Sequence, residues 1–144
     1  MMAVPSVEEF LDALDRAKLF RPEELQQLRD RLPADSRDAS ARALANVLVK
    51  RGLLTYWQSR QLIQGRTDCR VVKYMLLDFL GQGAFGEVFK ARATMMDRDV
   101  ALKGMGRQVT PASLKRFLRE IEVLSKLTHR NIVRLYDAFE DSDR

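Results

Sequence analysis

Hydrophobic spacing changes character near residue 70, and the part before it is typical of helices. Apolar side chains there recur every three or four residues, as they do when one face of an α-helix packs against a core. Four such segments precede residue 66, with short polar connections between them. The residues that we expect to face the core are Phe10, Leu11 and Leu14, then Leu25, Leu28 and Leu32, then Leu44, Val47 and Leu48, and finally Leu62 and Ile63. The pattern predicts a small bundle of four short helices.

Polar residues mark where these helices begin. Ser6 with Glu9, and Thr55 with Gln58, have the spacing of capping boxes, in which two side chains satisfy backbone N–H groups at a helix start. The third helix is predicted from about residue 38 to residue 51. A glycine follows each of the last two helices and suits a left-handed helix end.

The part after residue 70 is predicted to be a sheet with one helix. Strands are indicated at Tyr74–Leu80, Glu87–Arg92 and Val100–Lys103, a helix at about Pro111–Leu127, and a last strand at Ile132–Ala138. The apolar stripe of that helix comprises Leu114, Phe117, Ile121, Leu124 and Leu127. We therefore predict an α+β chain with a helical leader domain at 1–65, a linker at 66–73 and a second domain at 74–144.

The composition restricts the cellular compartments and the binding partners that we expect. A hydrophobic share of 46% and a charged share of 31% are ordinary for a soluble globular protein, so disorder is not expected. The net charge of +5 is spread along the chain, so only the basic pI favours nucleic-acid binding by the leader, and we expect none. The single cysteine, Cys69, cannot form an internal disulfide and is expected to be incidental. We expect a cytoplasmic chain without a signal peptide or membrane segment.

The run from Leu80 to Val88 carries the strongest chemical signal. Its glycines, Gly81, Gly83 and Gly86, form a G-x-G-x-x-G motif that by itself also fits an ordinary hairpin turn. A dinucleotide-binding fold would place a helix after the third glycine. Here alternating, aromatic and β-branched residues follow, so a strand is expected. The loop is then a hairpin whose backbone N–H groups approach phosphates without a Cβ in the way.

Two charged residues follow the loop at equal spacing. Lys103 ends an apolar strand 17 residues after Gly86, where an ammonium group can bind phosphate oxygens. Glu120 lies 17 residues further on, on the polar side of the predicted helix, from which it can reach the lysine. A solvated lysine and a surface glutamate are the alternative interpretation.

With these residues in place, the segment from Tyr74 to Phe139 resembles the amino-terminal lobe of eukaryotic-like serine/threonine protein kinases of bacteria. The glycine loop, the Ala101-x-Lys103 strand, the Glu120 helix and the run from His129 to Val133 match in order and spacing. The leader, with Gly52 to Thr55 and Leu62 to Gly65, is similar to the segment before the kinase domain in many planctomycete kinases. One departure is Gly104-Met105-Gly106 after the lysine, where β-branched residues are more usual.

The resemblance implies roles for particular residues, with ATP as the nucleotide and Mg²⁺ as the metal. The residues implied to contact ATP are Leu80, Gly81, Gln82, Gly83, Ala84, Phe85, Gly86, Val88, Ala101 and Lys103. Leu80, Val88 and Ala101 would surround adenine, and Glu120 would orient Lys103. His129 would hydrogen-bond to backbone. In the family's sheet a fifth strand lies between the third and fourth, so Ile132–Ala138 is expected to lack a neighbour.

Neither the H-R-D-x-x-x-x-N loop nor the D-F-G motif of kinases occurs in the 144 residues. These supply the base and the magnesium ligands, so no catalytic or metal-binding residue is expected in this chain. The predicted function is the ATP-binding part of a serine/threonine protein kinase whose full-length parent phosphorylates a protein substrate, with this chain inactive alone. The alternative is a non-catalytic regulatory or scaffold module that binds a protein partner through the helical leader.

Overall fold

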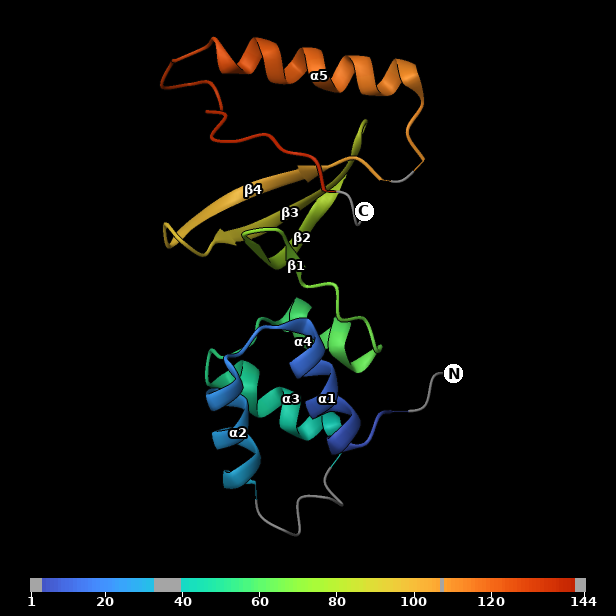
Figure 1. The fold of residues 1–144 in the computed structure, drawn as a ribbon, viewed down its shortest axis with the longest axis vertical. Helices are drawn as coiled ribbons and strands as arrows, with labels where there is room; N and C mark the ends of the chain where they lie inside the picture. Colours follow the sequence, from blue (N-terminus) through green and yellow to red (C-terminus); the bar gives the residue numbers. More distant parts are fainter. Residues whose placement is uncertain (1–3, 33–39, 107, 142–144) are drawn as a thin grey trace. The chain divides into compact units, whose positions relative to one another are not determined.

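The computed structural model describes residues 4–32, 40–106 and 108–141, and it has the α+β fold expected from the sequence (Figure 1). Four strands form one antiparallel sheet in the order β1-β2-β3-β4. The helices are α1 (Val7–Ala17), α2 (Pro22–Arg31), α3 (Ala41–Lys50), α4 (Tyr56–Ile63) and α5 (Pro111–Ser125). The strands are β1 (Arg70–Val71), β2 (Tyr74–Gly83), β3 (Gly86–Ala93) and β4 (Arg98–Gly104).

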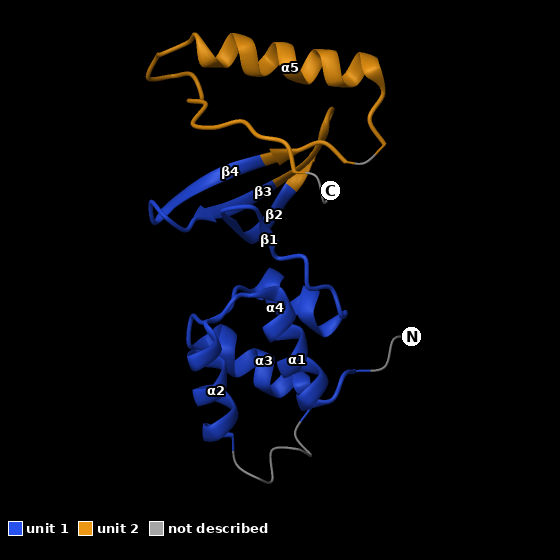
Figure 2. Ribbon diagram, viewed as in Figure 1, with its two compact units in different colours: residues 1–80, 89–102 blue, residues 81–88, 103–144 orange. Residues whose placement is uncertain are grey.

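The chain forms two compact units, and their boundary crosses the strands (Figure 2). The first unit contains residues 1–80 and 89–102, so it joins α1–α4 to most of the sheet. The second unit contains residues 81–88 and 103–144, which include the turn between β2 and β3 and helix α5. The helices of the leader and the larger part of the sheet therefore belong to the same compact unit.

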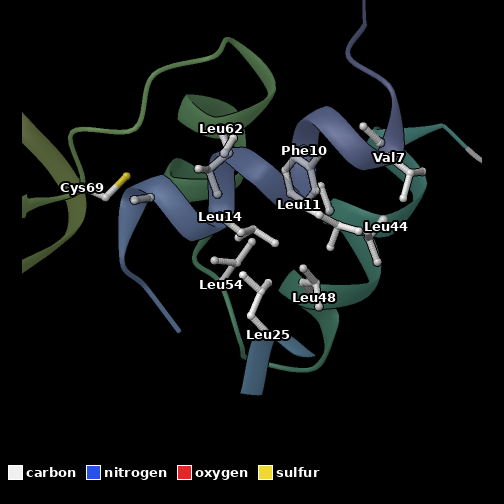
Figure 3. Packing of buried hydrophobic residues seen from close by; sticks show 14 residues of the cluster. Val7, Phe10, Leu11, Leu14, Leu25, Leu44, Leu48, Leu54, Leu62 and Cys69 are labelled. Carbon is white, nitrogen blue, oxygen red and sulfur yellow. The ribbon is translucent and has the colours of Figure 1, made fainter. Parts of the chain in front are cut away.

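The helical part of the first unit has a continuous apolar core. Phe10, Leu14, Leu48 and Leu62 are at most 1% exposed, and Figure 3 shows them packed with Leu25 of α2. Burying one such side chain stabilises the folded state by about 1.5–3 kcal/mol. The helical periodicity thus predicted this core.

One prediction about the leader and one about the linker were wrong in detail. Val47 was expected to face inward, but it is 42% exposed because Leu44 and Leu48 occupy the buried face of α3. Cys69 was expected to be incidental, yet its side chain is completely buried in the apolar core. A small polarisable thiol fits such a position well.

The two predicted capping boxes and the two predicted left-handed glycines are present. Ser6 Oγ accepts a hydrogen bond from Glu9 N, and the Glu9 carboxylate accepts one from Ser6 N at 2.7 Å. Hydrogen bonds to the carboxylate, first from the Ser6 backbone and then from the Ser6 side chain, lower the pKa of Glu9 below its ordinary value of 4.5. Gly52 and Gly65 have φ of +71° and +73°, as left-handed helix ends require. The predicted start of the third helix, near residue 38, lies outside the described residues.

The sheet has a small core of its own. Tyr74, Leu76, Ala91 and Ala93 are buried, and part of the segment predicted as a linker forms β1, which pairs antiparallel with β2. The first three of the four predicted strands are present as β2, β3 and β4, each extended by one or more residues.

The second unit differs from the prediction at its carboxyl end. Residues 132–138 are not a strand; they run without a ladder partner among the residues that the structure describes. A strand is held by hydrogen bonds to a neighbouring strand, so a suitable sequence alone does not form one. In α5, Phe117, Ile121 and Leu124 are half-buried as expected, but Leu114 is 44% exposed and Leu127 lies beyond the end of the helix.

Candidate functional site

The glycine motif forms the hairpin that its sequence predicts. Strand β2 ends at Gly83, β3 begins at Gly86, and Ala84 and Phe85 form the turn between them. Gly86 has φ of +144°, a conformation that side chains rarely allow. A Cβ atom at this position would lie 2.0 Å from the carbonyl oxygen of Gly104. Position 86 therefore needs glycine for two reasons, its backbone conformation and its close contact with the end of β4.

The other two glycines leave space around the backbone. A Cβ at Gly81 would meet nothing within 4 Å, and one at Gly83 would lie 3.5 Å from the nearest atom, the carbonyl oxygen of Gly86. Gln82 and Ala84 are exposed. The backbone between 81 and 84 is thus accessible to a ligand, as a phosphate-binding loop requires.

Lys103 and Glu120 are in contact. Lys103 Nζ lies 3.1 Å from Glu120 Oε1 and 3.3 Å from Oε2, and it donates a hydrogen bond to each. Both side chains are about one-third exposed, at 33% and 37%. An ion pair this accessible contributes about 1 kcal/mol or less to stability. Its main consequence is geometric, since it fixes an ammonium group at the end of β4.

The ammonium group also lies close to the glycine hairpin. The Cε atom of Lys103 is 4.0 Å from the position of a Cβ on Gly83. The ring of Phe85 lies under the same ammonium group, with Lys103 Nζ 5.0 Å from its centroid, which is cation–π geometry. Hairpin, lysine and glutamate all belong to the second unit, so one compact unit brings them together.

Sequence reasoning missed the partner of Phe85 on α5. The rings of Phe85 and Phe117 meet edge to face with centroids 6.4 Å apart. Phe117 was assigned only to the apolar stripe of the helix. It lies three residues before Glu120, so both side chains emerge on neighbouring turns of one helix face. That spacing was the available signal.

The three residues implied to surround adenine lie on three different strands. Leu80 on β2 is 57% exposed, Ala101 on β4 is exposed, and Val88 on β3 is half-buried. Leu80 and Ala101 belong to the first unit and Val88 to the second. Their common role in an adenine site remains a prediction.

The single histidine has the backbone hydrogen bond that the resemblance implied. His129 Nδ1 accepts from the backbone N–H of Asn131 at 3.1 Å, in the turn that follows α5. This bond holds the turn. Its geometry supports a structural role.

Residues 4–32, 40–106 and 108–141 hold no group of three or more His, Cys, Asp or Glu side chains placed to bind a metal ion. Over the same part of the chain, no helix combines the length and the apolar composition needed to cross a bilayer.

A glycine hairpin that approaches a strand lysine, with that lysine paired to a helix glutamate, is typical of nucleotide-binding lobes of protein kinases. Comparison with known proteins leads to the same class. Residues 74–144 match the protein kinase domain family. The α+β fold of this part of the chain is consistent with a kinase amino-terminal lobe.

Curated relatives match over about half of the chain. The chain is 39% identical over 83 residues to the serine/threonine-protein kinase PksC of Streptomyces coelicolor, covering 54% of this chain and 15% of that protein. It is 43% identical over 74 residues to cyclin-dependent kinase 7 of Xenopus laevis, covering 49% and 21%. It is 35% identical over 71 residues to the DNA damage-responsive serine/threonine-protein kinase RqkA of Deinococcus radiodurans, covering 49% and 11%.

The chain thus spans about a fifth or less of the length of these three relatives. Family and relatives together support a protein kinase, a class that uses ATP, Mg²⁺ and protein substrates in general.

Proposed function

We propose that residues 74–144 bind the phosphate chain of ATP as the nucleotide-binding part of a serine/threonine protein kinase. The observation that carries the proposal is the placement of Lys103 against both Glu120 and the glycine hairpin within one compact unit. Three features favour an anionic ligand here: open backbone at Gly81–Ala84, a fixed ammonium group, and no Cβ at the closest approach.

Each residue has a distinct task in this proposal. The backbone N–H groups of residues 81–86 donate to phosphate oxygens, and Lys103 adds a positive charge beside them. Glu120 keeps the lysine from adopting other rotamers when no nucleotide is bound. ATP, when bound, supplies the phosphoryl group.

Phe85 must respond to the nucleotide. Its ring covers the Lys103 ammonium group on the side of the hairpin turn, at 5.0 Å. Phosphate oxygens that approach Lys103 from that side exchange a cation–π contact for a charge-assisted hydrogen bond, which is stronger. We therefore expect the Phe85 ring to move when nucleotide binds.

The specificity, the type of kinase and the compartment that we propose rest on the resemblance and the relatives. Serine/threonine specificity is supported by the names of the relatives, which include two bacterial kinases. We propose a bacterial kinase of the planctomycete type that acts in the cytoplasm on a protein substrate. The described residues offer no set of metal ligands, so we assign no residue here to Mg²⁺.

We further propose that this 144-residue chain binds nucleotide without transferring phosphate. Its sequence contains neither an H-R-D-x-x-x-x-N loop nor a D-F-G motif, so it lacks the base for the substrate hydroxyl. Incubation with labelled ATP and a generic protein substrate is expected to give no labelled protein. Label incorporated by the chain alone, and retained after repurification, would contradict this part.

Binding itself is tested by equilibrium dialysis with labelled ATP on the wild type and on Lys103→Met. A lost charged hydrogen bond costs about 1.5–3 kcal/mol, so the affinity of Lys103→Met should fall at least about tenfold. Lys126→Met is the matched control, because Lys126 also pairs with a glutamate of α5, at 2.9 Å, but lies outside the site. Equal loss in both variants, or no binding by the wild type, would overturn the proposal.

A further inference from the structure

An aromatic row joins helix α4 to the sheet. The ring of Trp57 meets that of Phe89 edge to face, with centroids 5.7 Å apart and planes at 65°. Phe89 in turn meets Phe79 at 5.5 Å and 66°. Trp57 comes from the leader, Phe79 from β2 and Phe89 from β3, and all three lie in the first unit. The leader therefore contributes a side chain to the packing of the sheet.

Two hydrogen bonds support the same contact. Gln58 Nε2 donates to the carbonyl oxygen of Leu76 at 2.8 Å, and Gln58 is only 3% exposed. Thr55 Oγ1 donates to the carbonyl oxygen of Leu77 at 2.6 Å. A buried amide that lost its acceptor would be left without a hydrogen-bond partner, so these bonds specify where α4 lies on the strand.

The same two residues also cap α4. Gln58 Oε1 accepts from Thr55 N at 2.9 Å, while Thr55 Oγ1 accepts from Gln58 N at 3.1 Å. Each side chain thus uses its acceptor for the helix start and its donor for the sheet. The capping box predicted from the sequence is simultaneously the contact between leader and lobe.

The contacted residues lie on the strands that continue into the glycine loop. Leu76, Leu77 and Phe79 precede Gly81 on β2, and Phe89 directly follows Val88 on β3. Helix α4 therefore holds both the strand that enters the loop and the strand that leaves it. Because the backbone is continuous, a shift of either strand also moves the end of the glycine loop to which it is joined.

We propose that Trp57 and Gln58 are positioning residues for the glycine loop, so that nucleotide affinity depends on the docking of α4. This inference rests on the proposed function for its effect on nucleotide. It gives the leader a role within the lobe rather than one as a separate recruitment domain. Docking of α4 can change the free energy of nucleotide binding by no more than the free energy of the contacts that hold α4 on the sheet. Edge-to-face pairs contribute about 0.5–1.5 kcal/mol, so the expected change is about two- to tenfold.

The experiment compares four variants of the full chain. Trp57→Leu removes the ring pair, and Trp57→Phe restores a ring. Gln58→Glu keeps the acceptor that caps α4 but places an oxygen against the carbonyl of Leu76, so it weakens docking and not the helix start. Tyr56→Ala is the matched control, because Tyr56 is the neighbouring aromatic of α4 and is 67% exposed. Far-UV circular dichroism checks that each variant keeps its helices.

Two readouts separate this inference from the proposed function. Hydrogen exchange, measured without nucleotide, follows the amides of residues 79–89. We expect faster exchange in Trp57→Leu and Gln58→Glu, wild-type exchange in Tyr56→Ala, and rescue in Trp57→Phe. Equilibrium dialysis with ATP should show a two- to tenfold weaker affinity in the first two variants alone.

The outcomes are distinct. Faster exchange in the two docking variants, with a wild type that fails to bind ATP, would sink the proposed function and leave α4 as the support of the hairpin. ATP binding by the wild type, with exchange and affinity unchanged in both docking variants, would overturn the inference. A loss in Tyr56→Ala equal to that in Trp57→Leu would also overturn it, since the effect would then be general to α4.

Discussion

The helices of the leader and helix α5 are both amphipathic, yet they are held in different ways. Helix α1 buries six residues, including Phe10 and Leu14 at 0% exposure. Helix α5 is longer, with 15 residues, and buries none of them. The leader thus builds its own core, whereas α5 carries a half-buried stripe and Glu120, the partner of Lys103, in the second unit.

This difference separates stability from function along the chain. Elements with few buried apolar contacts open at low free-energy cost, and binding elements are commonly drawn from them. The residues of the proposed phosphate-binding site, in the glycine hairpin, Lys103 and α5, lie in the second unit. The first unit, with its apolar core and the strands on which α4 docks, supplies the framework.

The largest expected difference in stability between the leader and α5 is seen when one phenylalanine is removed from each. Replacing Phe10 by alanine leaves a cavity in a packed core, so we expect the free energy of unfolding to fall by about 3–5 kcal/mol. Phe117→Ala in α5 should cost about 1 kcal/mol or less, because its ring is only half-buried. Urea unfolding followed by circular dichroism measures both. Similar losses would mean that α5 has a core as strong as that of the leader.

A smaller effect is expected within the glycine hairpin. Gly86→Ala forces a side chain into a left-handed backbone conformation and against the carbonyl of Gly104, so it should destabilise the hairpin by about 1–3 kcal/mol. Gly81→Ala is the structural control, since a Cβ there meets nothing within 4 Å. Hydrogen exchange of residues 81–88 distinguishes the two, and equal exchange rates would show that the close contact imposes no constraint.

The ion pairs of the leader should matter less than its core. Arg29 of α2 reaches Glu8 and Asp12 of α1, and its side chain is 28% exposed. We expect Arg29→Met to lower the free energy of unfolding by about 1 kcal/mol, with part of this loss removed by high salt. Lys18→Met is the control, because Lys18 pairs with Asp15 of its own helix end rather than across two helices and is 67% exposed. The thermal midpoint of Lys18→Met should equal that of the wild type.

The smallest expected effect is a loss of stability at acidic pH. The pKa of Glu9 is lowered by hydrogen bonds from the backbone and then the side chain of Ser6, so its contribution is complete above the unfolded value of 4.5. It is lost as the pH falls below 4.5 through the lowered folded pKa. Thermal unfolding of Glu9→Gln, which keeps an acceptor but does not titrate, should depend less on pH between 5 and 3 than that of the wild type. An identical pH dependence would count against this assignment.

Much of the fold follows from local patterns. Periodic apolar residues predicted all five helices and the strands β2, β3 and β4, because these elements satisfy their backbone groups locally or through short hairpins. Capping boxes at Ser6 and Thr55 were predicted for the same reason. Predictions that depended on contacts between segments far apart in the sequence were less accurate. The strand at 132–138 is absent from the described residues, and Cys69 is buried because segments far apart in sequence enclose it.

For the site, the sequence alone determined the residue types and their spacing: three glycines in a hairpin, a lysine ending a strand, and a glutamate on a helix. Those features are local, and each has a steric or electrostatic reason. Only the tertiary structure decided that Lys103 meets Glu120, that Phe85 meets Phe117, and that Trp57 and Gln58 of the leader pack on β2 and β3. These contacts join residues 17 or more positions apart, and their formation depends on how whole elements pack rather than on any pattern within one of them.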